Sequence, residues 1–243
     1  MGGLDFNVIE RSWGYLFREG MTFTLTLTGL AALGGIIFGT ILAMMRLSSF
    51  KWLQLPATGY VNLMRSIPLL VQLFLWFFVL PELLPKAIGT SIKQMTPPWA
   101  SFVPAVIGLG LFTAARVSEQ VRAGIQALPR GQGMAATALG LTLPQTYRYV
   151  LLPMAYRIIM PPLTSETMNL IKNTSVALTI GLVELTAAGR GVQEFTFQVF
   201  EAFTAATLIY IVVNLIVVNL MRWLERSVSV PGFIGPQIAE GAH

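Results

Sequence analysis

The chain has 243 residues, of which 54% are hydrophobic and only 11% are charged, against roughly a quarter charged in an ordinary soluble domain. With a mean hydropathy of +0.68, too few charges remain to cover a water-facing surface, which indicates an integral membrane protein. The lack of cysteine excludes disulfides and thiolate chemistry. The single histidine, His243, and the single aspartate, Asp5, exclude a Ser–His pair or an aspartyl dyad inside the membrane. The net charge of +5 is more typical of topology signals than of nucleic-acid binding.

Five apolar segments predict five transmembrane helices, because a bilayer core needs about 20 apolar residues per helix. The clearest is Gly20–Met45, which contains no charge and holds a GxxxG motif at Gly35 and Gly39 that permits close helix contact. The others lie near Tyr60–Leu80, where Arg65 and Pro68 break the span, from Phe102 past Thr113, near Met154–Ser175 and at Ala202–Met221. The expected domains are an N-terminal segment over residues 1–19, a transmembrane domain over 20–225 and a cytoplasmic tail over 226–243.

The N-terminal segment carries Ile9, Trp13 and Phe17 at four-residue spacing. This pattern predicts a short interfacial helix that lies on the membrane surface and contacts lipid.

The distribution of charge predicts the orientation, since cytoplasmic links are enriched in lysine and arginine. The links after the first and third spans, and the start of the tail, are basic. The N-terminus and the link after the fourth span each carry more acidic than basic residues. We therefore expect the N-terminus outside and the C-terminus inside, although the link after the second span, with Glu82, Lys86 and Lys93, is slightly basic.

The link between the third and fourth spans, about residues 128–153, contains a predicted short helix over Met134–Leu143 that is rich in alanine and leucine. Pro144 opens a second helical stretch, and Pro153 marks the entry to the fourth span. An apolar helix in the cytoplasm must bury its face against the rest of the chain or against a partner. The residues alone leave both options open.

This link resembles the EAA motif of permease subunits of bacterial ABC importers, in which EAA is followed by three residues, glycine, nine residues and I-x-L-P. Ala135, Ala136, Gly140 and Val150–Pro153 match it, whereas Met134 replaces the usual glutamate. Arg65–Gln72 and Leu170–Ser175 are similar to the R-x-x-P-L-L-V-Q and L-I-K-N-T-S runs of polar amino-acid permeases. Within that family, the chain most resembles glutamate/aspartate importer permeases.

The resemblance implies an all-α integral membrane protein with the type I ABC importer permease fold. It implies a second permease, identical or paralogous, an ABC ATPase dimer that binds ATP and Mg²⁺, and an extracytoplasmic amino-acid-binding protein. This chain should bind no cofactor or metal and should not be an enzyme, since it lacks a GxxxxGK[ST] loop. The implied location is the bacterial inner membrane. The implied contacts to the ATPase are Met134, Ala135, Ala136, Gly140, Leu143, Pro144 and Pro153.

Charged residues inside a span are expensive and are therefore candidates for the substrate pathway. In the fourth span, polar residues at spacings of three and four form one stripe: Ser165, Glu166, Asn169, Lys172 and Asn173. Such a stripe can replace part of the water shell of an amino acid. Alternatively, Glu166 and Lys172 pair with other helices and hold the bundle together.

Arg65 belongs either to the pathway or to the subunit interface, or it donates to a backbone carbonyl freed by Pro68. Arg116, Glu119 and Arg122, at three-residue spacing, predict local ion pairs, with a gate or a brace for the coupling helix as the alternative. An excess of cations favours an acidic amino acid as substrate. The rival function is a stand-alone secondary transporter or channel, for which internal repeats, the usual sign, are not apparent.

Overall fold

The computed structural model describes residues 7–228, and every regular element in that range is a helix. Asp5, His243 and nearly all of the predicted cytoplasmic tail lie outside the described residues. In chain order the helices are α1 (Asn7–Tyr15), η1 (Leu16–Met21), α2 (Thr22–Leu47), α3 (Lys51–Ser66), α4 (Leu69–Phe74), η2 (Leu75–Val79), α5 (Leu80–Leu83), α6 (Lys86–Lys93), α7 (Trp99–Gln126), α8 (Arg130–Ala138), α9 (Leu143–Thr146), η3 (Tyr147–Leu151), α10 (Leu152–Asn173), η4 (Thr174–Ile180), α11 (Leu185–Thr196) and α12 (Val199–Val228).

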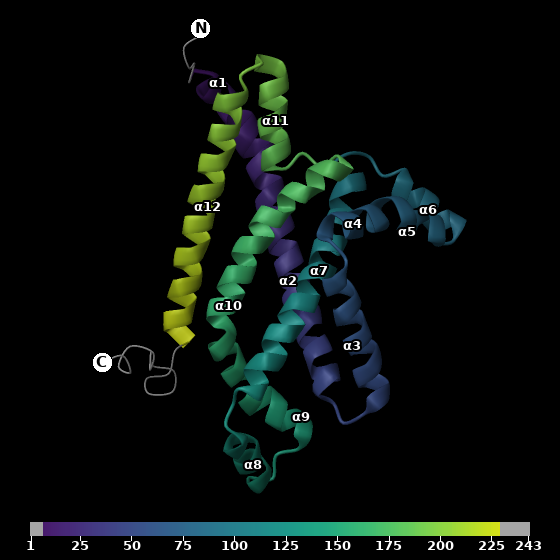
Figure 1. Cartoon of the computed structure of the whole chain (residues 1–243), viewed down its shortest axis with the longest axis vertical. Coiled ribbons are helices and arrows are strands. Elements are labelled where there is room, and N and C mark those ends of the chain that lie inside the picture. Colours follow the sequence, from purple (N-terminus) through teal and green to yellow (C-terminus); the bar gives the residue numbers. More distant parts are fainter. Residues whose placement is uncertain (1–6, 229–243) are drawn as a thin grey trace.

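Three of these helical stretches are long and apolar enough to cross a membrane unbroken: Asn7–Leu47, Trp99–Gln126 and Val199–Ser227. Two bent pairs, Lys51–Ser66 with Leu69–Leu83 and Leu143–Ile180 with Leu185–Thr196, bring the number to five when each counts as one span. The predicted first, third, fourth and fifth spans each fall within one of these stretches. Figure 1 shows the long helices side by side, with α8 and α9 gathered beyond one end of them.

The second span is broken where the sequence predicts, at Arg65 and Pro68, but it bends more sharply than an interrupted span near Tyr60–Leu80 implies. It is two helices that meet at 109° around Ile67 and Pro68. Proline lacks the N–H of a regular helix and frees a carbonyl in the preceding turn. Gln72 stabilises the break, because its buried Nε2 donates to the carbonyl oxygens of Met64 at 2.7 Å and of Ile67 at 2.9 Å. Gln72, and not Arg65, therefore donates to the carbonyl that Pro68 frees.

The N-terminal segment is not separate from the first span, because α1, η1 and α2 form one helix of 41 residues over Asn7–Leu47. Ile9 and Phe17 pack against a buried cluster that includes residues of α11 and α12, and Trp13 helps to line a groove against α12. The four-residue repeat thus lies along a groove beside α12, in which Trp13 is 49% exposed. Sequence periodicity identifies an apolar face but not whether lipid or protein covers it.

The contact between α2 and α7 depends on the GxxxG motif. A Cβ atom on Gly35 would lie 2.8 Å from Cγ2 of Thr113, and one on Gly39 would lie 2.7 Å from the carbonyl oxygen of Ala114. The two backbones approach each other where these glycines lack side chains. The predicted close helix contact at this motif is confirmed.

Gly39→Ala is expected to destabilise the fold by about 1–3 kcal/mol, because the methyl group overlaps the α7 backbone. Gly34→Ala is the matched control: it lies on the same helix, where an added Cβ meets no atom within 4 Å. Since alanine has the higher helix propensity, the control should be neutral or slightly stabilising. Thermal unfolding of the purified protein in detergent checks both, and equal melting temperatures for the two variants would refute this view of the contact.

Candidate functional site

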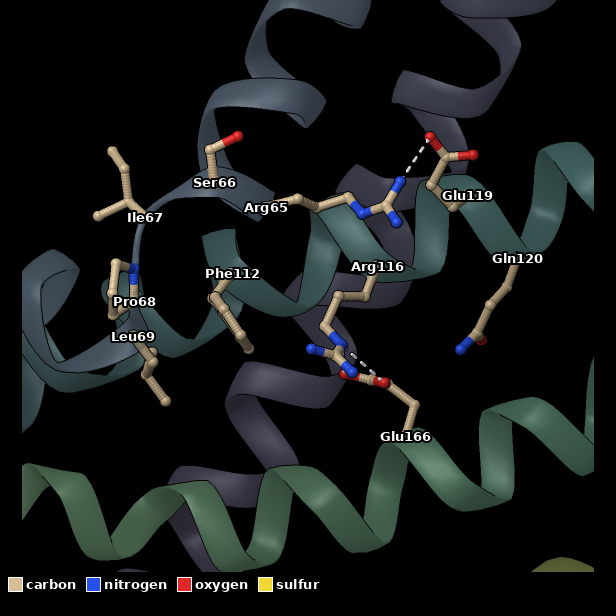
Figure 2. Close-up of a pocket in the computed structure, with 10 residues that line it drawn as sticks. All are labelled: Arg65, Ser66, Ile67, Pro68, Leu69, Phe112, Arg116, Glu119, Gln120 and Glu166. Carbon is tan, nitrogen blue, oxygen red and sulfur yellow. Dashed lines mark hydrogen bonds and ion pairs between the residues drawn. The ribbon is translucent and has the colours of Figure 1, made fainter.

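A cavity of about 580 Å³ lies where the broken second span faces α7 and α10 (Figure 2). Its wall is formed by the residues around the break, by one face of α7 and by a single residue of α10. The lining residues are Arg65, Ser66, Ile67, Pro68, Leu69, Phe112, Arg116, Glu119, Gln120 and Glu166. Four of these ten are arginine or glutamate, so the cavity is strongly polar for a membrane domain.

An ion pair between Arg116 of α7 and Glu166 of α10 crosses one side of the cavity. The Nε atom of Arg116 lies 2.8 and 2.9 Å from the two carboxylate oxygens of Glu166. The guanidinium also lies 5.4 Å from the ring centroid of Phe112, within cation–π range. Glu166 is buried, and Arg116 of another helix balances its charge. This is the pairing between helices that the sequence analysis gives as the alternative to a role in the pathway.

A second ionic cluster centres on Glu119 of α7. Its carboxylate lies 2.9 Å from Arg46 at the end of α2, 3.1 Å from Arg65 at the end of α3 and 2.9 Å from Arg122 of α7. Only the pair with Arg122 is the local pairing that the spacing predicts. The other two join the ends of two further helices to α7, so the cluster braces three helices.

Both arginines and both glutamates line the cavity, but the arginines are more exposed. The side chains of Arg65 and Arg116 are 53% and 43% exposed, whereas those of Glu119 and Glu166 are 22% and 7% exposed. Figure 2 shows the guanidinium group of each arginine beside the carboxylate of its partner. The cavity therefore presents hydrogen-bond donors and positive charge, which match the carboxylate of a ligand.

The other residues of the predicted stripe do not line this cavity. Asn169 and Asn173 are half-buried, Lys172 is exposed, and none of the three has a side-chain hydrogen bond or ion pair within residues 7–228. Ser165 is exposed and donates to the carbonyl of Pro161 in its own helix. Sequence analysis missed Phe112 and Gln120 as lining residues, and it used Arg46 only as a topology signal.

The link between α7 and α10 projects from the membrane-spanning helices as α8 and α9 (Figure 1). Helix α8 ends in a Schellman motif, in which the N–H groups of Gly140 and Leu141 donate to the carbonyls of Thr137 and Ala136. Gly140 has a φ of +78°, which glycine adopts without strain. Thr142 and Gln145 then form a capping box that starts α9.

Most of the predicted coupling residues are exposed. Within the described chain only Ala136 of this set is buried, while Leu139 beside them is 81% exposed. The exposed members of the set are Met134, Ala135, Gly140, Leu143, Pro144 and Pro153. This part of the chain does not bury its own apolar surface.

Comparison with known proteins identifies the family. The model of the family described as binding-protein-dependent transport system inner membrane component matches residues 35–230. The chain belongs to this family. It is a membrane-embedded permease subunit of the inner membrane, and ATP hydrolysis belongs to a separate subunit of such systems.

The permease is similar to several curated relatives over nearly its whole length. It is 47% identical to the glutamate/aspartate import permease protein GltJ of Escherichia coli K12, over 93% of this chain and 98% of the relative. It is 35% identical to GltK, a glutamate/aspartate import permease protein of Escherichia coli O6:H1, over 91% and 97%. The arginine transport system permease protein ArtQ of Bacillus subtilis is 34% identical, over 93% and 98%.

Solved structures bear out the expected type I importer fold. A crystal structure of an amino acid ABC transporter with histidines matches with a TM-score of 0.77 and 33% identity, over 93% of this chain and 100% of the other. The MetNI methionine ABC transporter matches with a TM-score of 0.72 at 20% identity, over 89% and 97%, which is a likeness of fold alone.

Proposed function

We propose that the permease forms, with a second permease subunit, the pathway through which an ATP-driven importer moves an acidic amino acid of the glutamate/aspartate type. A soluble binding protein delivers the amino acid on the outer side, and a separate ATPase dimer binds on the inner side. The names of GltJ and GltK support the substrate class, and the resemblance to paired importer permeases supports the second subunit.

The observation that carries the substrate class is the charge of the cavity. Two guanidinium groups, those of Arg65 and Arg116, face one space of about 580 Å³. The charges of the four lining arginines and glutamates balance, and Arg46 and Arg122, which pair with Glu119 from outside the cavity wall, leave two positive charges in excess around the cavity. An amino acid with two carboxylates balances that excess better than one with a neutral or basic side chain.

The exposed surface of α8 supports the ATPase contact. A short helix with Met134 and Leu139 facing outward in the aqueous phase is unfavourable unless a partner covers it. The match to the EAA motif gives the ATPase as that partner. The alternative, a stand-alone transporter or channel, leaves this surface without a role.

We expect Asn169→Leu to lower the uptake of radiolabelled L-glutamate at least threefold while the complex still assembles. Asn169 has no side-chain partner within residues 7–228 and belongs to the polar stripe, so its amide is available to a moving substrate. The matched control is Asn219→Leu on the exposed face of α12, where the amide bonds only within its own helix. Normal uptake in Asn169→Leu would remove the stripe from the pathway, and glutamate flux without any ATPase would favour the stand-alone transporter.

Leu139→Asp is expected to reduce co-purification of the ATPase at least tenfold without preventing membrane insertion. The change places a charge in an apolar contact while leaving the helix-ending Gly140 in place. Ile88→Asp on α6 is the control, since Ile88 is also an exposed aliphatic residue, at 51%, but lies on a different helix outside the α8–α9 link. Quantitative mass spectrometry of affinity-purified complexes measures both, and unchanged ATPase recovery with Leu139→Asp would place the contact elsewhere.

We further propose that the N-terminus faces outside and the C-terminal end of α12 inside, as the basic links indicate. The absence of cysteine allows a clean test with single introduced cysteines. In intact spheroplasts, a membrane-impermeant maleimide should label Gly14→Cys, which is exposed, and should label the equally exposed Ser227→Cys only after permeabilisation. The reverse labelling pattern would invert the topology.

A further inference from the structure

One carboxylate in the cavity has three guanidinium partners, and only one of those partners lines the cavity. Glu119 pairs with Arg46, Arg65 and Arg122, whereas the cavity wall includes Arg65 but neither Arg46 nor Arg122. One arginine is enough to neutralise one carboxylate. The additional cations therefore call for an explanation beyond local charge balance.

The three arginines are held to different degrees. Arg46 is buried, and Arg122 also donates to the side-chain oxygen of Gln126 at 3.0 Å. Arg65 is half-exposed, and its only side-chain partner among the described residues is Glu119, at 3.1 Å. Arg65 is thus the member of the cluster that is free to exchange its partner.

We propose that Glu119 is a placeholder for a substrate carboxylate. In the empty pathway it holds Arg65, and a carboxylate of the arriving amino acid takes its place. Glu119 then stays neutralised by Arg46 and Arg122. This inference rests on the proposed function, since it requires an acidic or at least carboxylate-bearing substrate in the cavity.

The exchange suits a transport pathway because one ion pair is replaced by another. The net gain on binding is then small, and a substrate that is bound weakly can leave again. It also gives the pocket a resting state in which no arginine lacks a partner, which matters where water is scarce.

The Arg116–Glu166 ion pair, by contrast, is not suited to exchange its partner. Glu166 is buried and has only Arg116 as a cation partner within residues 7–228. Removal of Arg116 would leave a buried carboxylate unpaired, which is strongly unfavourable. We therefore assign the exchange to Arg65 and a fixed position to the Arg116–Glu166 pair.

The test measures binding of radiolabelled L-glutamate to the purified complex of this permease with its second permease and ATPase, in detergent and without the binding protein. Glu119→Gln removes the competing carboxylate, so the affinity for glutamate should rise about threefold to tenfold. Maximal ATP-driven uptake in proteoliposomes should fall at the same time, because tighter binding slows release. Glu194→Gln is the matched control, since it removes one acidic charge from an exposed pair with Arg190 on α11.

Repeating the measurement in an Arg65→Met variant distinguishes competition between Glu119 and glutamate for Arg65 from a structural role of Glu119. Arg65→Met should weaken glutamate binding, and Glu119→Gln should then bring no gain in affinity, because the exchanged partner is missing. A Glu119→Gln gain of equal size in both backgrounds would overturn the placeholder. If Glu119→Gln fails to assemble, Glu119→Asp retains the charge for Arg46 and Arg122 but shortens the reach, and it should raise affinity about twofold.

The outcomes distinguish the placeholder from the proposed function. A wild-type complex that neither binds nor imports glutamate overturns the acidic substrate class, and the placeholder with it. A wild-type complex that binds glutamate through Arg65, with equal or weaker binding in Glu119→Gln and Glu119→Asp, overturns the placeholder alone.

Discussion

The hydrocarbon core offers no partner for a polar group, so the protein itself must satisfy every buried charge and every freed carbonyl. Most of the site follows from this constraint. Pro68 breaks the second span, and the buried amide of Gln72 bonds two carbonyls at the break. Glu166 lies within the membrane domain, where it forms an ion pair with Arg116 of the facing helix. The polar cavity lies where the helix break and the Arg116–Glu166 ion pair are next to each other.

The same constraint separates a rigid part of the permease from an adaptable one. Along α2 and α7, Gly35 and Gly39 bring two backbones into contact and leave no room for rearrangement. Across the cavity the contacts are ionic and partly exposed, so solvent or a ligand can compete for them. The tightly packed pair positions Arg116 and Glu119 on α7, and the residues that face them across the cavity come from the helix break and from α10.

The sequence was sufficient for the number of spans, the family and a close helix contact at Gly35 and Gly39, because apolar length, motif spacing and GxxxG are local signals, but it did not identify α7 as the partner helix. The sequence was not sufficient to predict which charged side chains form ion pairs with one another. The pair Arg116–Glu166 spans 50 residues, and the ends of two other helices bring Arg46 and Arg65 to Glu119, which no spacing in the chain encodes. Pro68 signalled a break, but the angle of 109° depends on how Gln72 and the neighbouring helices pack. The repeat of Ile9, Trp13 and Phe17 identified an apolar face, but not that its helix continues into the first span or that the face lies beside α12.

One helical stretch connects the exposed link to the cavity. Helix α9 continues through η3 and α10 without a bend that interrupts the stretch Leu143–Ile180, and the side chain of Glu166 lies on it. From Tyr147 to Glu166 the path is 19 residues, or about 28 Å at the rise of a helix. Pro161 and Pro162 lie within this path, so its hydrogen-bond ladder is interrupted just before Glu166. The fold therefore joins the link that carries Leu139 to the Arg116–Glu166 pair through one helical stretch with a proline break in it. The charge placed at Glu166 thus lies on the same helical stretch that begins beside the exposed link.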